Sequence, residues 1–305
     1  MAPSRRLRSF EILAAAGALA AVAACLPADE SLPLGSVEFT ITGRGPGRTL
    51  SEDDVVDGWS IHIDRFLLSF RSMAIGNTTS AEQCSYRGRG ANANVVFDGA
   101  IGTVVQTFNG VQTGHCPAVS VRFGPPDDQT VPGQGATAAD LVMLAQGRPA
   151  HALLEATARR RARPPFNDQD EMLRVSLRFE TDQTSSAFGG CRAASRGVTI
   201  RPFERASAAV DLDPSTFFRD ALSRTAALRF LPFYNADRLG DGDGTVTMDD
   251  LDRLPLASAV GPFYELPDGT THGSFGAYVR AQFMFAAQYD ERGLCNGVEP
   301  GRESE

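Results

Sequence analysis

The sequence predicts a mainly β protein: an antiparallel β-sandwich with a few short helices that lie mostly near the C-terminus. Two observations predict this class. Apolar and polar residues alternate with a period of two in several segments, which is typical of strands with one buried face. Clusters of Gly, Pro, Asn and Asp separate these segments at short intervals, as in 124–127, and favour tight turns over the crossovers of a parallel sheet.

The alternation is clearest in two segments. Val37, Phe39 and Ile41 alternate with polar residues, and 173–179 repeats the pattern. Each segment is therefore expected to be a strand that is buried on one side only. Less regular strands are expected at 59–70, 94–97, 104–108, 119–123, 150–158, 198–201 and 207–212.

Three short helices are expected between and after these strands. Thr137 can cap a helix that continues to Leu144. Asp213 is followed by proline, a favourable start for a helix over 215–222. A third helix, over 274–289, carries aromatic residues among small ones and can pack on the sandwich.

The first 24 residues are typical of an export signal. A basic start is followed by the apolar stretch 12–24, which is too short to span a bilayer as a helix. The stretch ends Val22-Ala-Ala-Cys25, which resembles the lipobox of bacterial lipoproteins. This resemblance implies that residues 1–24 are removed and that Cys25 is lipidated; secretory cleavage without lipid is the alternative.

The rest of the chain divides into three parts. Residues 25–35 contain prolines and acids and are expected to form a tether. Residues 36–212 form the β-sandwich body, and 213–305 form an α-rich C-terminal part. Leu26, rather than aspartate, follows the lipidated cysteine, which resembles lipoproteins of the bacterial outer membrane. The implied location is therefore that membrane, with the body in the periplasm or at the cell surface.

Charge and composition exclude several classes of function. The 305 residues include 29 bases and 37 acids, and every base is arginine, which excludes mechanisms that depend on a lysine. Loss of three arginines and one glutamate with the leader takes the net charge from −8 to −10. Arg159–Arg161 with Arg163 form the main basic cluster. On so acidic a chain, this cluster favours a solvated turn or a contact with anionic headgroups over a nucleic-acid site.

Four cysteines remain besides Cys25, and an even number in an exported protein favours two disulfides. Three pairings are possible. We favour one bond between neighbours in sequence and one that ties the C-terminal tail to the body, with free buried thiols as the alternative. The favoured pairs are Cys84 with Cys116 and Cys191 with Cys295.

An acidic stretch at 235–251 carries the most informative motif. Asp241-x-Asp243-Gly244 supplies two carboxylates at alternate positions and a glycine that can adopt a sharp turn. The stretch resembles the EF-hand and dockerin-type calcium loop from its third position onward. The residues that the resemblance offers to Ca²⁺, with water, are Asp237, Asp241, Asp243, the Thr245 carbonyl and Asp250.

The loop departs from the EF-hand pattern at its start. Its first acidic position falls on Leu239, so Asp237 can serve only if two residues are inserted. Pro232 argues against a regular incoming helix. At the other end Asp250 replaces glutamate, and Thr247 can cap a short helix through it. The alternative is an acidic Gly/Asp turn that binds no ion.

The sequence therefore predicts a calcium-stabilised, lipid-anchored envelope protein without catalysis. It resembles uncharacterised EF-hand-bearing bacterial lipoproteins, and its partner would be an envelope protein or a glycan, not a nucleic acid. The alternative is a periplasmic copper-handling or carbohydrate-binding sandwich that uses Trp59, His62 and a second histidine among 115, 151 and 272. An enzyme would need convergent carboxylates or a His/Asp pair in a cleft.

Overall fold

The structure is a computed structural model. It describes residues 34–43, 48–76, 95–116, 118–162, 169–180, 187–192, 198–259, 264–289 and 293–294. All of them belong to one compact unit, Leu34–Glu305. Cys25 and the predicted leader lie outside the described residues.

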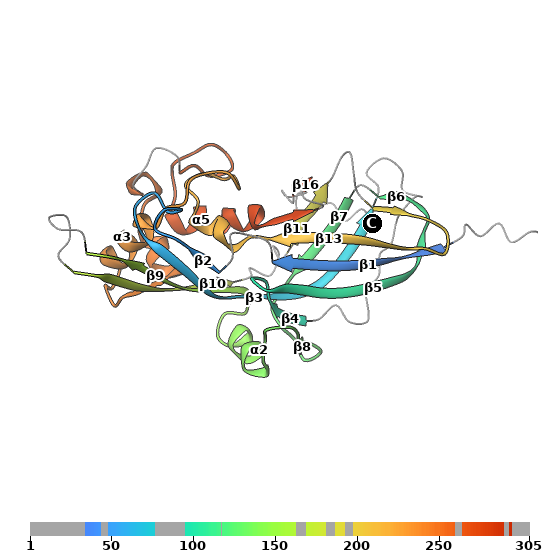
Figure 1. Cartoon of the computed structure of the whole chain (residues 1–305). Helices are drawn as coiled ribbons and strands as arrows, with labels where there is room; N and C mark the ends of the chain where they lie inside the picture. Colours follow the sequence, from blue (N-terminus) through green and yellow to red (C-terminus); the bar gives the residue numbers. More distant parts are fainter. Residues whose placement is uncertain are drawn as a thin grey trace, which may run out of the picture. The chain divides into compact units, whose positions relative to one another are not determined.

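In the described part of the chain, fourteen strands join into one sheet and two more pair separately (Figure 1). The main path of the large sheet is β14-β10-β9-β3-β7-β11-β16-β15-β13-β1-β5; β2 and β4 pair with β3, and β8 with β4. The strands are β1 (Leu34–Gly43), β2 (Thr49–Leu50), β3 (Ser60–Gly76), β4 (Val95–Asp98), β5 (Gly102–Gln112), β6 (Gly114–Cys116), β7 (Ala118–Phe123), β8 (Val131–Pro132), β9 (Ala150–Arg160), β10 (Glu171–Glu180), β11 (Ala187–Arg192), β12 (Val198–Ile200), β13 (Arg205–Leu212), β14 (Thr245–Thr247), β15 (Ala287–Tyr289) and β16 (Gly293–Leu294).

Most neighbouring strands run antiparallel, as predicted. The exceptions among the described strands are the pairs β1 with β13, β10 with β14, and β4 with β8. Every segment that the alternation marks as a strand is a strand in the structure. The additional strands, such as β14 and β16, have two to six residues, too few for a period of two to show.

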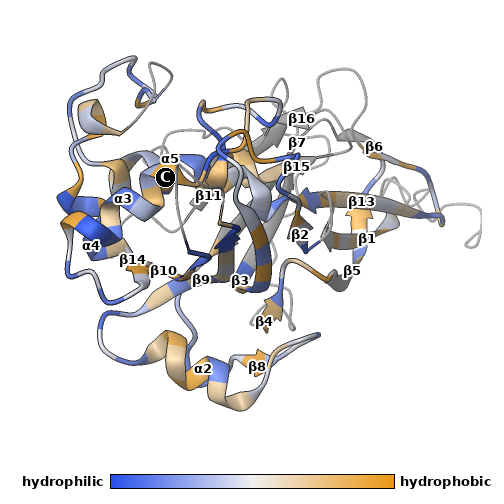
Figure 2. Ribbon diagram, turned by 60° about the vertical axis from the view of Figure 1, so that its left-hand side comes forward, coloured by the Kyte–Doolittle hydropathy of each residue, from blue (hydrophilic) through white to orange (hydrophobic). Residues whose placement is uncertain are grey.

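Two parts of the large sheet face each other across the core, which gives the sandwich. Phe39 of β1 and Phe70 of β3 show this contact: their strands are not neighbours in the sheet, yet their rings stack with centroids 6.1 Å apart. Both side chains belong to one continuous cluster of buried apolar residues. Figure 2 shows hydrophobic and hydrophilic residues mixed along the strands and mostly hydrophilic residues on α4 and the adjacent part of α3.

The described helices are short and mostly C-terminal. The capping box that Thr137 and Asp140 form at the start of the first helix fits the predicted cap. The third predicted helix ends at Ala286, because the chain then forms β15 and pairs with β13. The α-helices are α2 (Ala138–Ala145), α3 (Leu231–Leu239), α4 (Met248–Arg253) and α5 (Phe275–Ala286), and the 3₁₀-helices are η1 (Pro214–Phe218) and η2 (Leu256–Ser258).

The helix predicted at 215–222 is wrong beyond its first turn. Asp213 caps it as expected by accepting a hydrogen bond from the backbone N–H of Ser215, but only the 3₁₀ turn η1 forms. The chain then becomes extended and Arg219 pairs with Leu228 in an isolated bridge. Tertiary pairing here outweighs local helix preference.

Candidate metal centre

A helix, an acidic loop, a short strand and a second helix follow one another in the C-terminal part. α3 enters the loop at 240–244, β14 joins the loop to the sheet, and α4 follows. The expectation that Pro232 prevents a regular incoming helix is wrong. Pro232 lies in the first turn of α3, where its missing N–H costs no helical hydrogen bond. The Oδ2 of Asp57 caps this end by accepting hydrogen bonds from Phe230 N–H (2.8 Å) and Leu231 N–H (2.6 Å).

Glycines end α3 and reverse the chain. Gly240 N–H donates to the Ala236 carbonyl at 2.8 Å, and Gly242 N–H donates to the Asp237 carbonyl at 2.9 Å. Gly242 and Gly244 have φ angles of +67° and +83°, which residues with a Cβ rarely adopt. The loop therefore folds back against the last turn of the helix.

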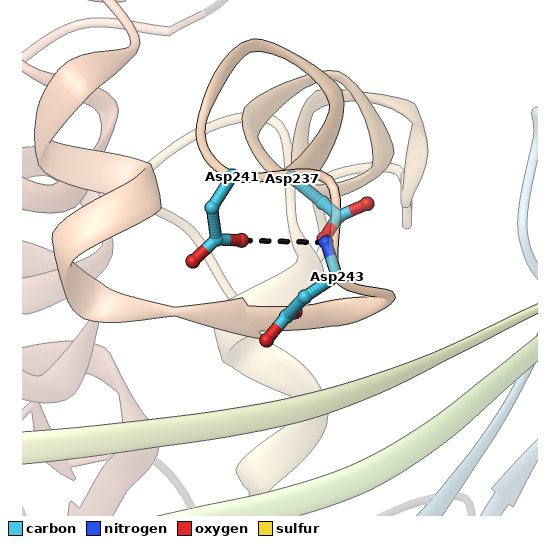
Figure 3. Close-up of side chains that lie close together, drawn as sticks. All are labelled: Asp237, Asp241 and Asp243. Atoms are coloured by element: carbon cyan, nitrogen blue, oxygen red, sulfur yellow. Dashed lines mark hydrogen bonds between the residues drawn. The ribbon is translucent and has the colours of Figure 1, made fainter.

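This reversal brings three predicted ligands together, as Figure 3 shows. Asp237 comes from α3, and Asp241 and Asp243 come from the loop. One carboxylate oxygen of each lies within 4.8 Å of the other two. Asp237 is buried, with 5% of its surface exposed, whereas Asp241 and Asp243 are exposed. The group is therefore open to solvent on one side and backed by the helix on the other.

In the EF-hand pattern the first acid would stand at position 239, two residues after Asp237. The two extra residues are part of the helix. Arg238 and Leu239 form the last residues of α3. Leu239 is 68% exposed, and the Arg238 guanidinium lies over the Tyr234 ring, 5.5 Å from its centroid. The insertion that Asp237 requires is thus accommodated by extending the helix, and Asp237 stands one half-turn before its end.

Backbone N–H groups hold all three carboxylates. Asp237 Oδ1 accepts from Gly244 N–H at 3.1 Å, Asp243 Oδ1 accepts from Thr245 N–H at 2.7 Å, and Asp241 Oδ1 accepts from Asp243 N–H at 3.4 Å. A carboxylate offers about four lone-pair sites, so each retains capacity for a cation. The backbone of the loop thus positions the three carboxylates through its own hydrogen bonds.

Asp250 is not among the three grouped carboxylates, and the Thr245 carbonyl, the remaining predicted ligand, stays a prediction. Thr245 begins β14 and pairs with Arg174 of β10. Asp250 lies in α4, where its Oδ2 accepts from the backbone N–H (2.9 Å) and the hydroxyl (2.6 Å) of Thr247. Thr247 accepts in return from Asp250 N–H, so the predicted capping box is present. Asp250 acts as a helix cap here, and its role as a ligand stays a prediction.

The electrostatic environment of Asp237 is unfavourable to its charge. Burial raises the pKa of its carboxyl, and the negative charges of Asp243, Asp250 and Asp241 add to the rise. The hydrogen bond from Gly244 N–H opposes it. In the described part of the chain, no arginine forms an ion pair with the three grouped carboxylates. Three hard oxygen donors without a cationic side chain can bind a metal ion.

Trp59 does not offer the surface that a carbohydrate site would need. It is fully buried, and its ring lies 4.8 Å from Phe230 and 5.5 Å from Tyr234 between centroids. Arg160 covers it, with the guanidinium carbon 5.0 Å from the ring centroid. An indole enclosed in this way cannot stack on a sugar.

The described histidine side chains do not converge. His62 on β3 pairs in register with Thr157 of β9, and His151 lies six residues away on β9, which is about 20 Å along a strand. Burial lowers the pKa of His151 to about 4. His272 is exposed in the loop before α5, and the side chain of His115 lies outside the described residues. A copper site built on His62 therefore has no second histidine among the described side chains.

The predicted basic cluster is divided between ion pairs. Arg160 donates to Glu171 at 2.7 Å, and Arg161 Nε lies 3.2 Å from a carboxylate oxygen of Glu52. Arg163 lies outside the described residues. Arg160 and Arg161, two of the three described arginines of this cluster, are thus paired with acids.

One charged feature near the loop has no counterpart in the sequence analysis. A cavity of about 310 Å³ lies beside α4, and α5 and β10 contribute to its wall. Arg280 of α5 makes two hydrogen bonds to Asp252 of α4, at 2.7 and 2.6 Å. Burial disfavours the charge of Asp252, but the bonds from Arg280 outweigh it and lower the pKa. Twenty-eight residues separate the pair, so no local pattern could predict it.

The proposed disulfides cannot be followed in the structure. Cys84 and Cys295 lie outside the described residues. Cys116 and Cys191 lie in β6 and β11, but their side chains are outside the described part. Both pairings stay predictions.

Comparison with known proteins gives little further information. No family model and no curated protein matches the chain. Among solved structures, MbnP from Methylosinus trichosporium is similar at 13% identity and a TM-score of 0.26, over 61% of this chain and 77% of that chain. A likeness at this level does not indicate what the chain binds. Among the described helices, none has the length and apolar character needed to cross a membrane.

Proposed function

We propose that this chain is a lipid-anchored cell-envelope protein whose acidic loop binds one Ca²⁺ ion, and that the ion stabilises the fold rather than performing catalysis. The observation that carries the proposal is the grouping of Asp237, Asp241 and Asp243 around one point at the end of α3. Three carboxylates at this separation repel one another unless a cation screens them.

Calcium fits this arrangement better than magnesium. Ca²⁺ accepts six to eight oxygens in irregular geometry, whereas Mg²⁺ requires a near-ideal octahedron. The three carboxylates, the Thr245 carbonyl and water can supply that number, and a modest movement could add Asp250. Because two of the carboxylates are exposed, we expect a dissociation constant on the order of 10⁻⁴ to 10⁻³ M.

The lipid anchor is proposed on the sequence alone. Cys25 is the attachment site, residues 25–35 are the tether, and the outer membrane is the location that Leu26 favours. The β-sandwich body would face an envelope protein or a glycan.

Thermal melting of fragment 26–305, which contains the whole compact unit, tests the calcium proposal. At 10 to 100 times the dissociation constant, calcium should add roughly 1.4 to 2.7 kcal/mol of stability. EDTA should remove the gain, and Asp243→Asn should abolish it. Asp268→Asn is the matched control, because Asp268 makes the same turn bond, to Thr270 N–H at 2.9 Å, outside the loop. If Asp268→Asn also abolishes the gain, or Asp243→Asn retains it, the loop is not the site.

A further inference from the structure

The most exposed large apolar side chain of the described residues lies beside the point where the chain enters the folded unit. Phe203 is 90% exposed. Its backbone N–H donates to the carbonyl of Leu34 at 3.0 Å, and Leu34 is the first described residue. Leu34 is itself 46% exposed. A phenylalanine and a leucine thus meet at the start of β1, on the surface.

The turn that carries Phe203 is strained. Arg201 to Glu204 form a β-turn closed by a hydrogen bond from Glu204 N–H to the Arg201 carbonyl at 3.2 Å, with Pro202 at its second position. Phe203 has a φ of +60° at the third position, which in such a turn is normally filled by glycine or asparagine. A bulky apolar residue therefore occupies a position that is unfavourable both for its backbone and for its side chain.

The turn is also held firmly against the entering chain. Ser36 N–H donates to the Glu204 carbonyl at 3.0 Å. Gly35 is so close to the turn that a Cβ would lie 2.5 Å from Ile200 Cγ2 and 2.6 Å from the Arg201 carbonyl oxygen. Because Ile200 is buried, the turn is anchored in the core and presents Phe203 in a fixed position.

The length of the tether limits what can cover this surface. Leu34 is the ninth residue after Cys25, and an extended chain covers at most about 3.6 Å per residue. A lipid on Cys25 would keep Leu34 within about 32 Å of the bilayer, and Phe203 is hydrogen-bonded to Leu34. Because about 32 Å is the upper limit, a tether that is not fully extended lets Phe203 and Leu34 reach the boundary between headgroups and acyl chains, where Phe and Leu side chains can be buried.

From these observations we propose that Phe203 and Leu34 insert into the bilayer that holds the lipid anchor and orient the folded unit on it. The inference rests on the proposed lipidation of Cys25. Lipid chains would supply the attachment, and the Phe203 turn would fix the angle. α3 and its acidic loop lie at the other end of the unit from the start of β1 (Figures 1 and 2), so the calcium site would point away from the membrane.

The contact is expected to be apolar rather than electrostatic. Arg201 lies 3.8 Å from Glu204, and Arg205 lies 3.4 Å from Glu38, so the charges that flank Phe203 are balanced. Insertion should therefore be the same in phosphatidylcholine vesicles as in vesicles that contain phosphatidylglycerol, and it should change little with salt.

Tryptophan fluorescence of the lipidated full chain in phosphatidylcholine vesicles tests the inference. Phe203→Trp should show a blue-shifted emission that is quenched when the lipids carry brominated acyl chains. Leu239→Trp is the matched control, because Leu239 is 68% exposed at the end of α3, and its emission should not be quenched. The native Trp59 is fully buried and gives the background in the wild type.

The outcomes separate the inference from the proposal beneath it. If the protein floats with the vesicles but Phe203→Trp is quenched no more than Leu239→Trp, the inference is wrong and the anchor stands. If mass analysis finds no lipid on Cys25 and the protein does not float with the vesicles, the proposed anchor is wrong. The inference, which rests on that anchor, is then wrong as well. Phe203→Gly is the companion variant, and it should not lower the melting temperature. In the wild type, vesicles should slow the amide hydrogen exchange of residues 201–205. In Phe203→Gly, vesicles should not slow it.

Discussion

The backbone N–H of Gly244 donates a hydrogen bond to Oδ1 of Asp237 at 3.1 Å. This bond joins the last turn of α3 to the turn that precedes β14. It holds the Asp237 carboxylate at the loop, although the EF-hand spacing places the first acidic ligand at position 239, which is Leu239. The next bond along the chain, from Arg174 N–H to the Gly244 carbonyl at 3.0 Å, fixes the same turn to the sheet. The carboxylate group is therefore positioned from the helix and from β10 together.

Asp237→Asn should have opposite effects with and without calcium. In EDTA the variant should melt at a higher temperature than the wild type, because a buried charge that faces three other acids is removed; the gain should be on the order of 1 kcal/mol. With calcium the order should reverse, because one anionic ligand is lost. Calorimetric melting of both proteins in both solutions checks this. A variant that is less stable in EDTA would show that Asp237 is structural.

Calcium affinity should fall as the pH is lowered. The pKa of Asp237 is raised above its ordinary value of 3.8, so the folded, ion-free protein keeps this proton to a higher pH than the unfolded chain does. The stability that the proton provides is present at low pH and is lost as the pH rises through the raised pKa. Calcium needs the ionised carboxylate and competes with that proton. Titrations between pH 4 and 7 should show the decline, which Asp237→Asn should reduce; equal slopes would contradict the assignment.

Gly244 should not tolerate alanine. Its φ of +83° disfavours any Cβ, although no atom lies within 4 Å of the place where a Cβ would stand. The cost is therefore confined to the backbone, at about 1 kcal/mol or more. Gly244→Asn should cost less, because asparagine adopts this conformation more readily. Denaturant unfolding in EDTA compares the two variants; an equal loss for both would mean that the side chain, not φ, is responsible.

The sequence predicts those parts of the fold that local chemistry controls. Val37, Phe39 and Ile41 mark β1 because burial alternates along it, and Thr247 with Asp250 marks the start of α4 because the cap is made within three residues. The three grouped acids also come from one short stretch. Features of the fold that depend on residues far apart in the sequence could not be predicted from local patterns. Pro232 lies in the first turn of a helix whose start is capped by Asp57, which is far away in sequence. η1 stops because Arg219 pairs with Leu228.

The predicted bond between Cys191 and Cys295 can be tested directly. In the antiparallel pair of β11 and β16, Arg192 lies opposite Leu294. Cys191 directly precedes Arg192 and Cys295 directly follows Leu294 in the sequence, and the bond between these two cysteines stays the predicted one. Non-reducing proteolysis and mass analysis should find them linked, and Cys191→Ser should cost about 2 to 4 kcal/mol. A peptide that joins Cys191 to Cys84 or Cys116 would exclude this pairing.

Calcium titration calorimetry of fragment 26–305 tests the central claim most directly. The account predicts one site per chain in the wild type, the same site in Asp268→Asn, and no measurable heat of binding in Asp243→Asn. Magnesium should bind more weakly than calcium. Absence of calcium binding by the folded wild-type fragment at millimolar concentrations, or unchanged binding in Asp243→Asn, would contradict the account and leave the loop as an acidic turn that needs no ion.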